Sequence, residues 1–294
     1  MLSNLKRTIS VIIAISSITC TTFLGARQII QSDNKLDVYG NDTKHGAFAD
    51  INGVKIYYEI YGKGDPLLLI HGNGQAIADM KHQVEFFKNK YMVIVADSRG
   101  HGKSELGTTA LTYEQMTDDY EKLLGKLKIN KVNIIGWSDG GIIGMILGFK
   151  HPEKVGKLAI MGANLNPSGA HKWAIDWVAK NIVAVNAMID KNNNKNEHFK
   201  RIKQALELIV NQPNISKDDL HKITAPTLVM TGDKDAVRLE HTIEIFENIP
   251  SAHLCVFPGA THMIPEMDPK LFNETVSIFL TNKFTRPDTK DLFQ

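Results

Sequence analysis

The stretch VNIIGWSDGGIIG, residues 132–144, decides the fold, because it leads from a short apolar run into a serine held between glycines. Its centre, GWSDG at 136–140, has the form G-x-S-x-G, which is typical of a sharp turn from a strand into a helix. Such a turn strains the serine backbone and crowds its neighbours, so glycine is needed on both sides. The turn also places the hydroxyl at a helix N-terminus, where free amides can stabilise an oxyanion. The sequence therefore predicts a nucleophile at Ser138.

Asp139 follows this serine directly, although attack on a carbonyl group would build negative charge nearby. A carboxylate aimed at that charge would oppose the reaction, so we expect the side chain to turn away while the backbone N–H serves the oxyanion. Two roles stay open for the carboxylate. It can stabilise the first turn of a helix by roughly 0.3–1 kcal/mol, or it can bind a cationic group on the substrate through a charge-assisted hydrogen bond.

Short, nearly continuous apolar runs recur along the chain and mostly end in glycine or charged residues. They are LLLI (67–70), MVIVA (92–96), VNIIG (132–136), KLAIMG (157–162), TLVMTG (227–232) and HLCVF (253–257). Segments with helical spacing of apolar residues lie between them, for example residues 112–129. This alternation predicts an α/β fold with a mostly parallel central sheet and helices on both faces. Ligands bind at the carboxyl ends of such strands, so we expect the catalytic and substrate-binding residues at that edge of the sheet.

The domain organisation follows from composition. Residues 32–46 are polar and predict a linker, and residues 284–294 predict a polar tail. Between them, residues 47–283 form the predicted domain, which begins with a hairpin that turns at Asn52-Gly53. Residues 164–222 interrupt the alternation with two amphipathic helical patterns, so we expect a helical lid above the sheet edge.

Trp173 and Trp177 lie one turn apart on the first lid helix. Their side chains either face a substrate pocket or seal the lid onto the core, and periodicity does not separate these two interpretations. Both residues are therefore candidates for substrate binding.

A serine hydroxyl is a weak nucleophile and needs an adjacent base that a third group orients. His262 follows the last apolar run, in FPGATHMIPE, and is the candidate base. An acid follows the preceding run, in LVMTGDKDA, where Asp233 and Asp235 both fit on chemistry. All these residues follow strands, which brings them to one edge of the predicted sheet.

With these residues in place, the chain resembles the α/β-hydrolase family over roughly residues 47–283. Four motifs carry the resemblance: HGNG (71–74), DSRGHGKS (97–104), GWSDGG (136–141), and GDKD with GATH, which ends at His262. In this family the acid usually stands three residues after the glycine that ends its strand. The resemblance therefore implies a Ser138–Asp235–His262 triad, with Asp233 capping the turn.

The resemblance also implies an oxyanion hole made by the backbone N–H groups of Asn73 and Asp139. The elbow is similar to that of valacyclovirase-like α-amino-acid ester hydrolases, which share a Trp-Ser-Asp elbow. Those enzymes hold the substrate's α-ammonium group with the elbow aspartate, and that role would fall on Asp139. The lid shows no clear match, so a leaving-group preference is not implied.

Other polar residues near these motifs are expected to be structural. His71 and His101 belong to strand-end turns, and Asp97 and Arg99 are expected to pair locally or to satisfy loop amides. The histidines show no metal-ligand spacing, and HGNG is too short for a dinucleotide or phosphate fingerprint, so no cofactor or metal is implied. With Cys20 inside the N-terminal apolar segment, Cys255 is expected to be an unpaired strand residue.

The N-terminus differs from the rest of the chain. In residues 1–31, Lys6 and Arg7 precede an uncharged segment, a pattern that predicts a signal peptide or an N-terminal membrane anchor. A helix packed on the domain is the alternative. We expect export, with the protein secreted or anchored on the outer face of the cytoplasmic membrane, and otherwise a cytoplasmic location; membrane association would run through residues 8–25. The net charge is +2 without a basic block, so nucleic acid is not an expected partner.

Three functions fit these residues. The leading hypothesis is a serine hydrolase that cleaves carboxylic esters of small substrates through an acyl-enzyme, with a preference for cationic amino groups left open. The second is an aminopeptidase-like or lactone hydrolase on the same triad. The third is a slow or non-catalytic ligand-binding receptor. A haloalkane dehalogenase would need a carboxylate at the elbow, and Ser138 argues against it.

Overall fold

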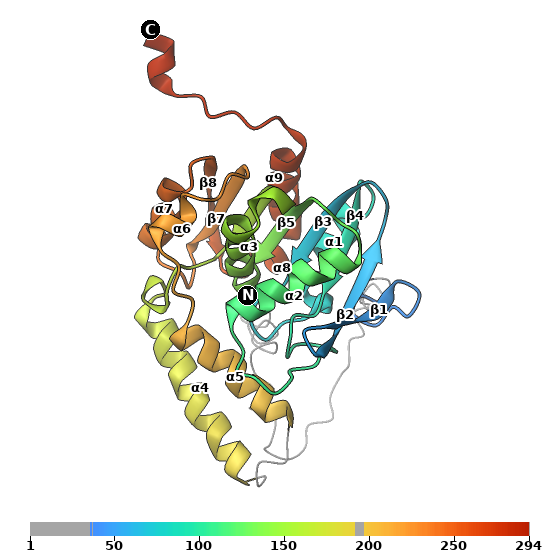
Figure 1. The fold of residues 1–294 in the computed structure, drawn as a ribbon. Helices are drawn as coiled ribbons and strands as arrows, with labels where there is room; N and C mark the ends of the chain where they lie inside the picture. Colours follow the sequence, from blue (N-terminus) through green and yellow to red (C-terminus); the bar gives the residue numbers. More distant parts are fainter. Residues whose placement is uncertain (1–35, 37, 192–196, 294) are drawn as a thin grey trace, which may run out of the picture.

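The computed structural model describes residues 36, 38–191 and 197–293, and these residues form a sheet of eight strands in the order β1-β2-β4-β3-β5-β6-β7-β8 (Figure 1). The strands are β1 (Gly46–Ile51), β2 (Val54–Tyr61), β3 (Asp65–Ile70), β4 (Tyr91–Ala96), β5 (Val132–Trp137), β6 (Val155–Met161), β7 (Thr227–Lys234) and β8 (Ala252–Thr261). Pairing is antiparallel from β1 through β2 to β4 and parallel from β4 to β8. The predicted mostly parallel sheet is confirmed.

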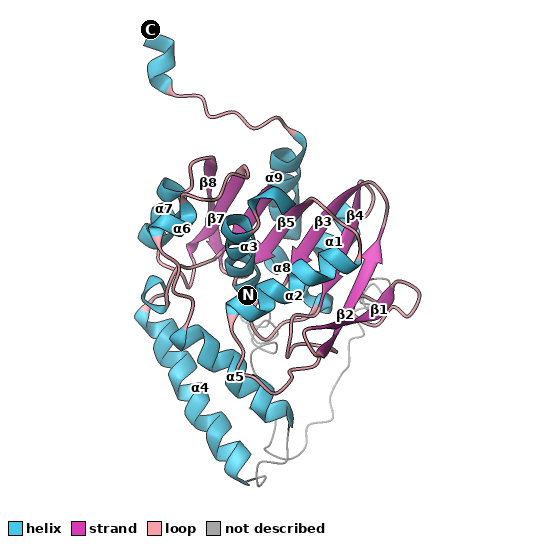
Figure 2. Ribbon diagram, viewed as in Figure 1, coloured by secondary structure: helices cyan, strands magenta, loops and turns pink. Residues whose placement is uncertain are grey.

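Helices cover both faces of this sheet (Figure 2). The main helices are α1 (Lys81–Phe87), α2 (Tyr113–Lys126), α3 (Asp139–Lys150), α4 (Lys172–Lys191), α5 (Glu197–Asn211), α7 (Leu239–Asn248) and α9 (Pro269–Thr281), with the short α6 (Lys217–Leu220) and α8 (Ile264–Met267). One apolar cluster joins the sheet to α2, α3 and α7, and a second joins its other face to α1 and α9. The sheet is therefore a buried middle layer.

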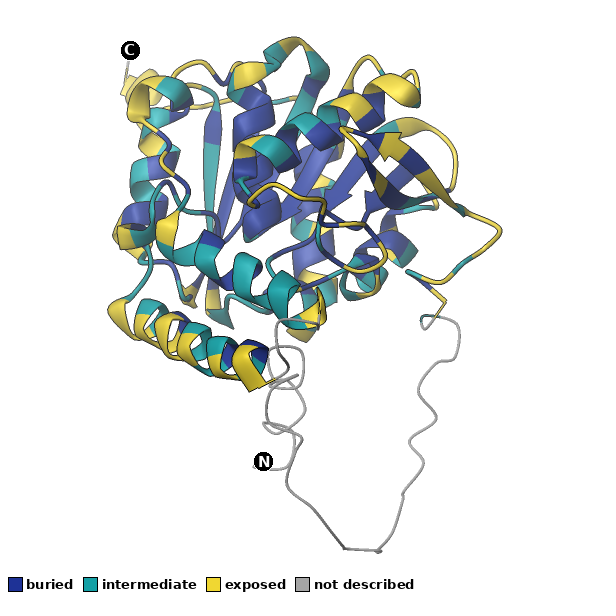
Figure 3. Cartoon of the chain, turned by 60° about the horizontal axis from the view of Figure 1, so that its bottom comes forward, coloured by how far each residue is buried: buried dark blue, intermediate teal, exposed yellow. Residues whose placement is uncertain are grey.

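Strand β3 shows why its sequence is an unbroken apolar run. Leu68 and Ile70 point into the cluster with α2 and α3, whereas Leu67 and Leu69 point into the cluster with α1 and α9. All four side chains have no exposed surface. A strand that is buried on both faces cannot alternate with polar residues, and Figure 3 shows the central strands as the most buried part of the chain.

The N-terminal hairpin turns where the sequence predicts. Asn52 and Gly53 have φ angles of 47° and 76°, so both turn residues are left-handed, as a two-residue hairpin turn of the favoured kind requires. Strands β1 and β2 flank this turn directly.

The segment before β1 differs from the expected linker. Tyr39 is buried, and its ring packs edge-on against Tyr61 at 5.1 Å between centroids. The backbone N–H groups of Gly40 and Asp42 donate to the buried carboxylate of Glu59 on β2, at 2.9 and 3.0 Å. The polar composition of this segment did not indicate that it packs on the domain, because the partner of Tyr39 is Tyr61, which lies later in the chain on β2.

Two long helices, α4 and α5, follow β6 and pack against each other through Val178, Val185 and Leu206. They lie beyond the carboxyl ends of the parallel strands (Figure 1), so they form the lid referred to below. At the other end of the chain, the tail after α9 extends away from the body and carries a short 3₁₀ helix, Thr289–Phe293.

The predicted signal peptide or anchor, residues 1–31, lies outside the described residues. Within the part of the chain that the structure describes, no helix has the length and apolar character needed to cross a membrane. Cys255 lies half-buried on β8 as a free cysteine.

Candidate active site

Ser138 stands at the strand-to-helix turn between β5 and α3. Its backbone has φ 56° and ψ −116°, a strained conformation for a residue with a side chain. A Cβ on Gly136 would lie 2.2 Å from the carbonyl oxygen of Gly140, and a Cβ on Gly140 would lie 2.0 Å from that of Ile70. Glycine is therefore required on both sides of the serine, which is the physical basis of the motif.

His262 follows β8, and its Nδ1 lies 2.7 Å from a carboxylate oxygen of Asp235, which follows β7. The Asp235 carboxylate is buried and also accepts a hydrogen bond from the backbone N–H of Val237 at 3.0 Å. Asp233 is exposed and instead accepts from the backbone N–H of Gly259 at 2.9 Å. The structure thus joins His262 to Asp235, while Asp233 holds the backbone of Gly259 near the end of β8.

The electrostatics of this pair favour an ionised carboxylate. Burial acts to raise the pKa of Asp235, but the charge and hydrogen bond of His262, with two backbone amides, outweigh it and hold that pKa below its ordinary value. Burial acts to lower the pKa of His262, yet attraction to Asp235 outweighs it and raises that pKa. Because the carboxylate accepts at Nδ1, the neutral ring carries its proton there and Nε2 is left as a base.

Gly162, at the end of β6, lies directly against the histidine ring. Its φ is +64°, and a Cβ at this position would lie 2.6 Å from two ring atoms of His262 and 3.5 Å from the Asp235 carboxylate. Only a residue without a side chain leaves room for the imidazole in its observed position. Sequence reasoning missed Gly162, although a glycine that ends an apolar strand was a visible signal.

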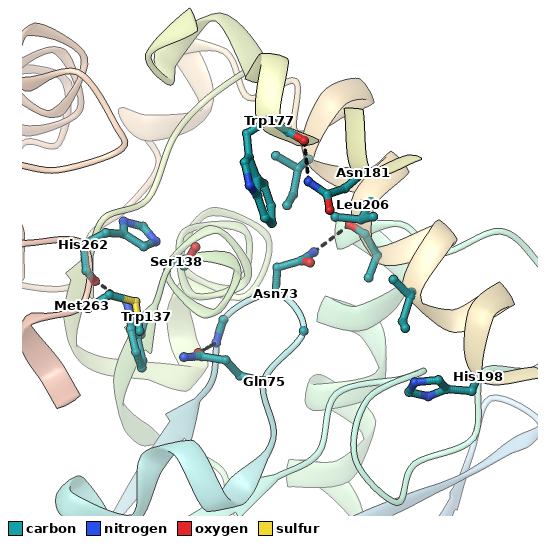
Figure 4. A pocket seen from close by; sticks show the side chains of 15 residues that line it. Asn73, Gln75, Trp137, Ser138, Trp177, Asn181, His198, Leu206, His262 and Met263 are labelled. Atoms are coloured by element: carbon teal, nitrogen blue, oxygen red, sulfur yellow. Dashed lines mark hydrogen bonds between the residues drawn. The ribbon is translucent and has the colours of Figure 1, made fainter. Parts of the chain in front are cut away.

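Ser138 and His262 both line a cavity of about 280 Å³ beneath the lid. Within the described residues no hydrogen bond joins their side chains, but Figure 4 shows the histidine ring directed toward the serine. Catalytic hydrogen bonds often form only when substrate is present. The two groups therefore face a common space that a substrate can enter.

The far wall of the cavity comes from the lid. Helix α5 supplies an apolar surface, and polar groups lie at its edge and in the loop after β3 (Figure 4). The apolar lid residues are Ile202, Ala205, Leu206 and Ile209, and the polar ones around them are Asn73, Gln75, Asn181 and His198. Such a surface suits an uncharged group with a modest apolar chain.

The two tryptophans of α4 have different positions. Trp177 lines the cavity with 39% of its surface exposed. Trp173 does not line it: the side chain is 62% exposed and stacks beside His171, with ring centroids 6.4 Å apart. The expectation that Trp173 faces the substrate or seals the lid is wrong, because the helix presents that position to solvent.

The two residues expected to form the oxyanion hole, Asp139 and Asn73, both belong to segments next to Ser138. Asp139 is the first residue of α3, so its N–H has no partner within that helix. Asn73 lines the cavity in the loop after β3, and that loop is fixed by a 2.7 Å hydrogen bond from the Gly72 N–H to the Gln75 side chain. A Cβ on Gly72 would lie 3.0 Å from the Cβ of Ser138, so the loop passes very close to the serine.

The Asp139 side chain turns away from this space. One carboxylate oxygen accepts from the Tyr113 hydroxyl at 2.8 Å and the other from the Asn73 side-chain amide at 2.9 Å. The carboxylate is buried and is not among the residues that line the cavity. Burial raises its pKa although both hydrogen bonds oppose the shift. The expected binding of a cationic substrate group by Asp139 is not confirmed, because both carboxylate oxygens already have hydrogen-bond donors within the protein.

The two strand-end histidines are held as structural groups. His71 Nε2 accepts from the Ser98 N–H at 2.9 Å, and burial lowers the pKa of His71 to about 4. Burial likewise lowers the pKa of His101 to about 4. Neither residue lines the cavity that contains Ser138.

Asp97 and Arg99 were expected to pair locally or to satisfy loop amides. Asp97 does satisfy loop amides, since it accepts from the backbone N–H groups of Ile77 and Lys103, each at 2.8 Å. Arg99 pairs over a longer distance in the sequence: its guanidinium makes two 2.7 Å hydrogen bonds to Asp119 on α2, with both side chains buried. Among the described residues, no group of three or more His, Cys, Asp or Glu side chains could hold a metal ion.

Comparisons with known proteins agree with this geometry. A family model described as alpha/beta hydrolase fold matches residues 65–188. The serine hydrolase BPHL of Homo sapiens is 28% identical over 252 residues, which cover 78% of this chain and 84% of that protein. The putative carbamate hydrolase RutD of Azorhizobium caulinodans is 25% identical over 260 residues, covering 78% of this chain and 94% of that protein.

A solved structure is similar over much of the chain as well. Est816, described as an N-acyl homoserine lactone degrading enzyme, has a TM-score of 0.65 and 27% identity, and the match covers 79% of this chain and 100% of the other. The likeness therefore extends over most of the chain and is not confined to the serine motif.

Proposed function

We propose that this chain, which belongs to the α/β-hydrolase family, is a serine hydrolase that cleaves carboxylic esters of small molecules through an acyl-enzyme on Ser138. The observation that carries this proposal is the position of His262. Its Nδ1 is hydrogen-bonded to the buried carboxylate of Asp235, and its ring faces the cavity that Ser138 also lines. A base that a carboxylate orients toward a strained serine is the arrangement that nucleophilic acyl transfer needs.

In the acylation step, the Ser138 hydroxyl oxygen attacks the ester carbonyl carbon while Nε2 of His262 takes the hydroxyl proton. Asp235 holds the ring and stabilises its positive charge. The carbonyl oxygen becomes an oxyanion that accepts hydrogen bonds from the N–H groups of Asn73 and Asp139. As the tetrahedral species collapses, the carbon–oxygen bond to the leaving alkoxide breaks, and His262 returns the proton to release an alcohol.

Deacylation repeats these steps with water. His262 removes a proton from water, the hydroxide oxygen attacks the acyl-serine carbonyl, and the same two amides bind the oxyanion. Collapse breaks the bond to the serine oxygen, and the proton on His262 restores the hydroxyl. The products are a carboxylic acid and the free enzyme.

The cavity supports an uncharged substrate with a short or medium apolar chain. Its volume is about 280 Å³, and α5 supplies aliphatic side chains to its lining. The described lining residues include no carboxylate, and the carboxylate of Asp139 already has two hydrogen-bond donors. The proposed function of the wild-type protein therefore does not include a preference for substrates with cationic amino groups.

Lactone opening is the second candidate, because it uses the same serine, base and amides on a cyclic ester. It is favoured by the likeness to Est816, whose description names an N-acyl homoserine lactone as its substrate class. For a lactone, the alcohol stays attached to the acyl group after the ring opens, so the cavity must hold both halves during deacylation. The apolar wall of α5 could accommodate an N-acyl chain.

The test is a comparison of substrates on one purified protein. Hydrolysis of p-nitrophenyl butyrate, an N-acyl homoserine lactone and a p-nitroanilide is measured with the wild type and with Ser138→Ala. We expect turnover of the ester or the lactone, a much slower reaction of the anilide, and loss of all turnover in the variant. Ester turnover that survives in Ser138→Ala would contradict the proposal.

We also propose that residues 1–31 direct export, on the basis of Lys6 and Arg7 followed by an uncharged segment. A fusion of residues 1–31 to the N-terminus of alkaline phosphatase tests this, since the phosphatase is active only when it is exported. Activity equal to that of a fusion without these residues would contradict it.

A further inference from the structure

We propose that the Asn73 side chain determines specificity by covering the Asp139 carboxylate, so that the cavity admits neutral acyl groups and excludes cationic ones. This inference rests on the proposed function, because it concerns the acyl group presented to Ser138. Asn73 acts here through its side chain, which is separate from the role of its backbone amide in the oxyanion hole.

Asn73 separates Asp139 from the cavity. One carboxylate oxygen of Asp139 is bonded to the hydroxyl of Tyr113, a fully buried residue of α2, so that oxygen faces the protein body. The other oxygen is bonded at 2.9 Å to the amide of Asn73, which lines the cavity. In Figure 4 the Asn73 side chain projects into the space between Ser138 and the lid. The path from the cavity to the carboxylate therefore passes through this side chain.

A second hydrogen bond holds Asn73 in this position. The same amide nitrogen donates at 2.8 Å to the backbone carbonyl of Ala205 on α5. Both hydrogens of the Asn73 side-chain amide are therefore donated, one to Asp139 in the main domain and one to Ala205 in the lid. A cationic substrate would have to break both bonds before it reached Asp139, and the displaced amide would then need new partners.

Removal of the Asn73 side chain would turn a covered carboxylate into a binding site. Asp139 would keep Tyr113 but lose the donor on its cavity side, and a buried carboxylate that lacks a donor is costly. An ammonium group is similar in size to the lost amide NH₂ group and donates a stronger, charge-assisted hydrogen bond. The vacated space should therefore favour a positively charged α-substituent over a methyl group.

The experiment uses two p-nitrophenyl esters that differ in one group: 2-aminobutyrate, which carries an ammonium, and 2-methylbutyrate, which carries a methyl in its place. The assay is run at about pH 6.5, below the usual α-amino pKa of about 7.7–8.0. The readout is the ratio of kcat/KM for the aminoacyl ester to that for the neutral ester. We expect the wild type to favour the neutral ester and Asn73→Ala to raise the ratio about tenfold or more.

Two further variants separate this effect from a general loosening of the loop. Gln75→Ala removes the 2.7 Å hydrogen bond that fixes the same loop but leaves Asn73 on Asp139, so the ratio should stay at the wild-type value even if turnover falls. In Asn73→Ala combined with Asp139→Asn, the ratio should return toward the wild type. Asn73→Ser, whose side chain is too short to make both bonds, replaces Asn73→Ala if that variant does not fold.

A binding measurement keeps the inference independent of turnover. Titration calorimetry in the Ser138→Ala background compares protonated 2-aminobutyramide with 2-methylbutyramide, with and without Asn73→Ala. A selective gain for the ammonium compound in both experiments supports the inference. An unchanged preference in Asn73→Ala, an equal gain in Gln75→Ala, or a gain that persists without the Asp139 carboxylate overturns it. Failure of the wild type to cleave the neutral ester counts against the proposed function instead, and the calorimetry still decides the role of Asn73.

Discussion

The indole Nε1 of Trp137 donates a 2.8 Å hydrogen bond to the backbone carbonyl of His262. Trp137 is the last residue of β5 and directly precedes Ser138, and its side chain is almost completely buried. The strand that carries the nucleophile therefore also holds the loop that carries the base. This bond fixes the relative position of two groups that come from distant parts of the chain.

Replacement of Trp137 by Phe tests this link. The variant keeps an aromatic ring in the core but leaves the His262 carbonyl without its donor, a loss of about 1 kcal/mol for one hydrogen bond. We expect kcat/KM for p-nitrophenyl butyrate to fall by about fivefold or more, because the imidazole loop gains freedom. Phe257→Leu, in the same apolar cluster, is the control: it should lower the free energy of unfolding in urea without a comparable loss of kcat/KM.

The pH dependence of activity should report the His262–Asp235 pair. Acylation needs the neutral imidazole, and the pKa of His262 is raised because attraction to Asp235 outweighs the effect of burial. Activity should therefore fall as the pH drops through a value above the ordinary histidine pKa of about 6.5. In Asp235→Asn the larger of the two raising influences is lost and only the weaker attraction to Asp139 still opposes burial, so the acid limb of kcat/KM should move to lower pH while turnover falls by roughly 10⁴-fold. An acid limb that does not move would contradict the assigned pair.

Gly162→Ala should displace the histidine ring. A Cβ would lie 2.6 Å from two ring atoms of His262, and a small misplacement of a catalytic group can cost on the order of 10²-fold in rate. Gly259→Ala is a matched control, because Gly259 has nearly the same φ, +66°, but no atom within 4 Å of the added Cβ. Both variants carry similar backbone strain, so only Gly162→Ala should lose kcat. Equal losses would mean that strain alone is responsible.

The wall of α5 should set the length of the acyl chain that the cavity accepts. Ile202 lines the same cavity as Ser138, and Ile202→Trp would fill part of it. We expect kcat/KM for p-nitrophenyl octanoate to fall about tenfold relative to the acetate, because each excluded CH₂ loses about 0.8 kcal/mol of burial. Val183→Trp, on the exposed side of α4, should leave this ratio unchanged.

The sheet and the elbow could be predicted because their signals are local. Apolar runs such as Leu67 to Ile70 mark strands buried on two faces, and Gly136 before Ser138 is required by its contact with Gly140 within the same turn. The hairpin at Asn52-Gly53 has the same local origin. Each of these features follows from backbone geometry that neighbouring residues determine.

The remaining features depend on contacts between distant segments. The ion pair of Arg99 with Asp119, the attachment of Tyr39 to β2 and the contact of Gly162 with His262 join residues that no short pattern connects. The exposed position of Trp173 depends on how α4 packs on α5, and helical spacing alone did not fix that face. The position of the Asn73 side chain over Asp139 likewise depends on the lid, because Asn73 also donates a hydrogen bond to Ala205 on α5.

The central claim is that Ser138 is a nucleophile activated by His262, and covalent labelling tests it most directly. The purified protein is incubated with a fluorophosphonate, and the modified residue is identified by mass spectrometry of its peptides. We predict a single phosphonylated residue, Ser138, with labelling abolished in Ser138→Ala and strongly slowed in His262→Ala. A folded wild-type protein that gains no label, or gains it on another residue, would contradict the claim.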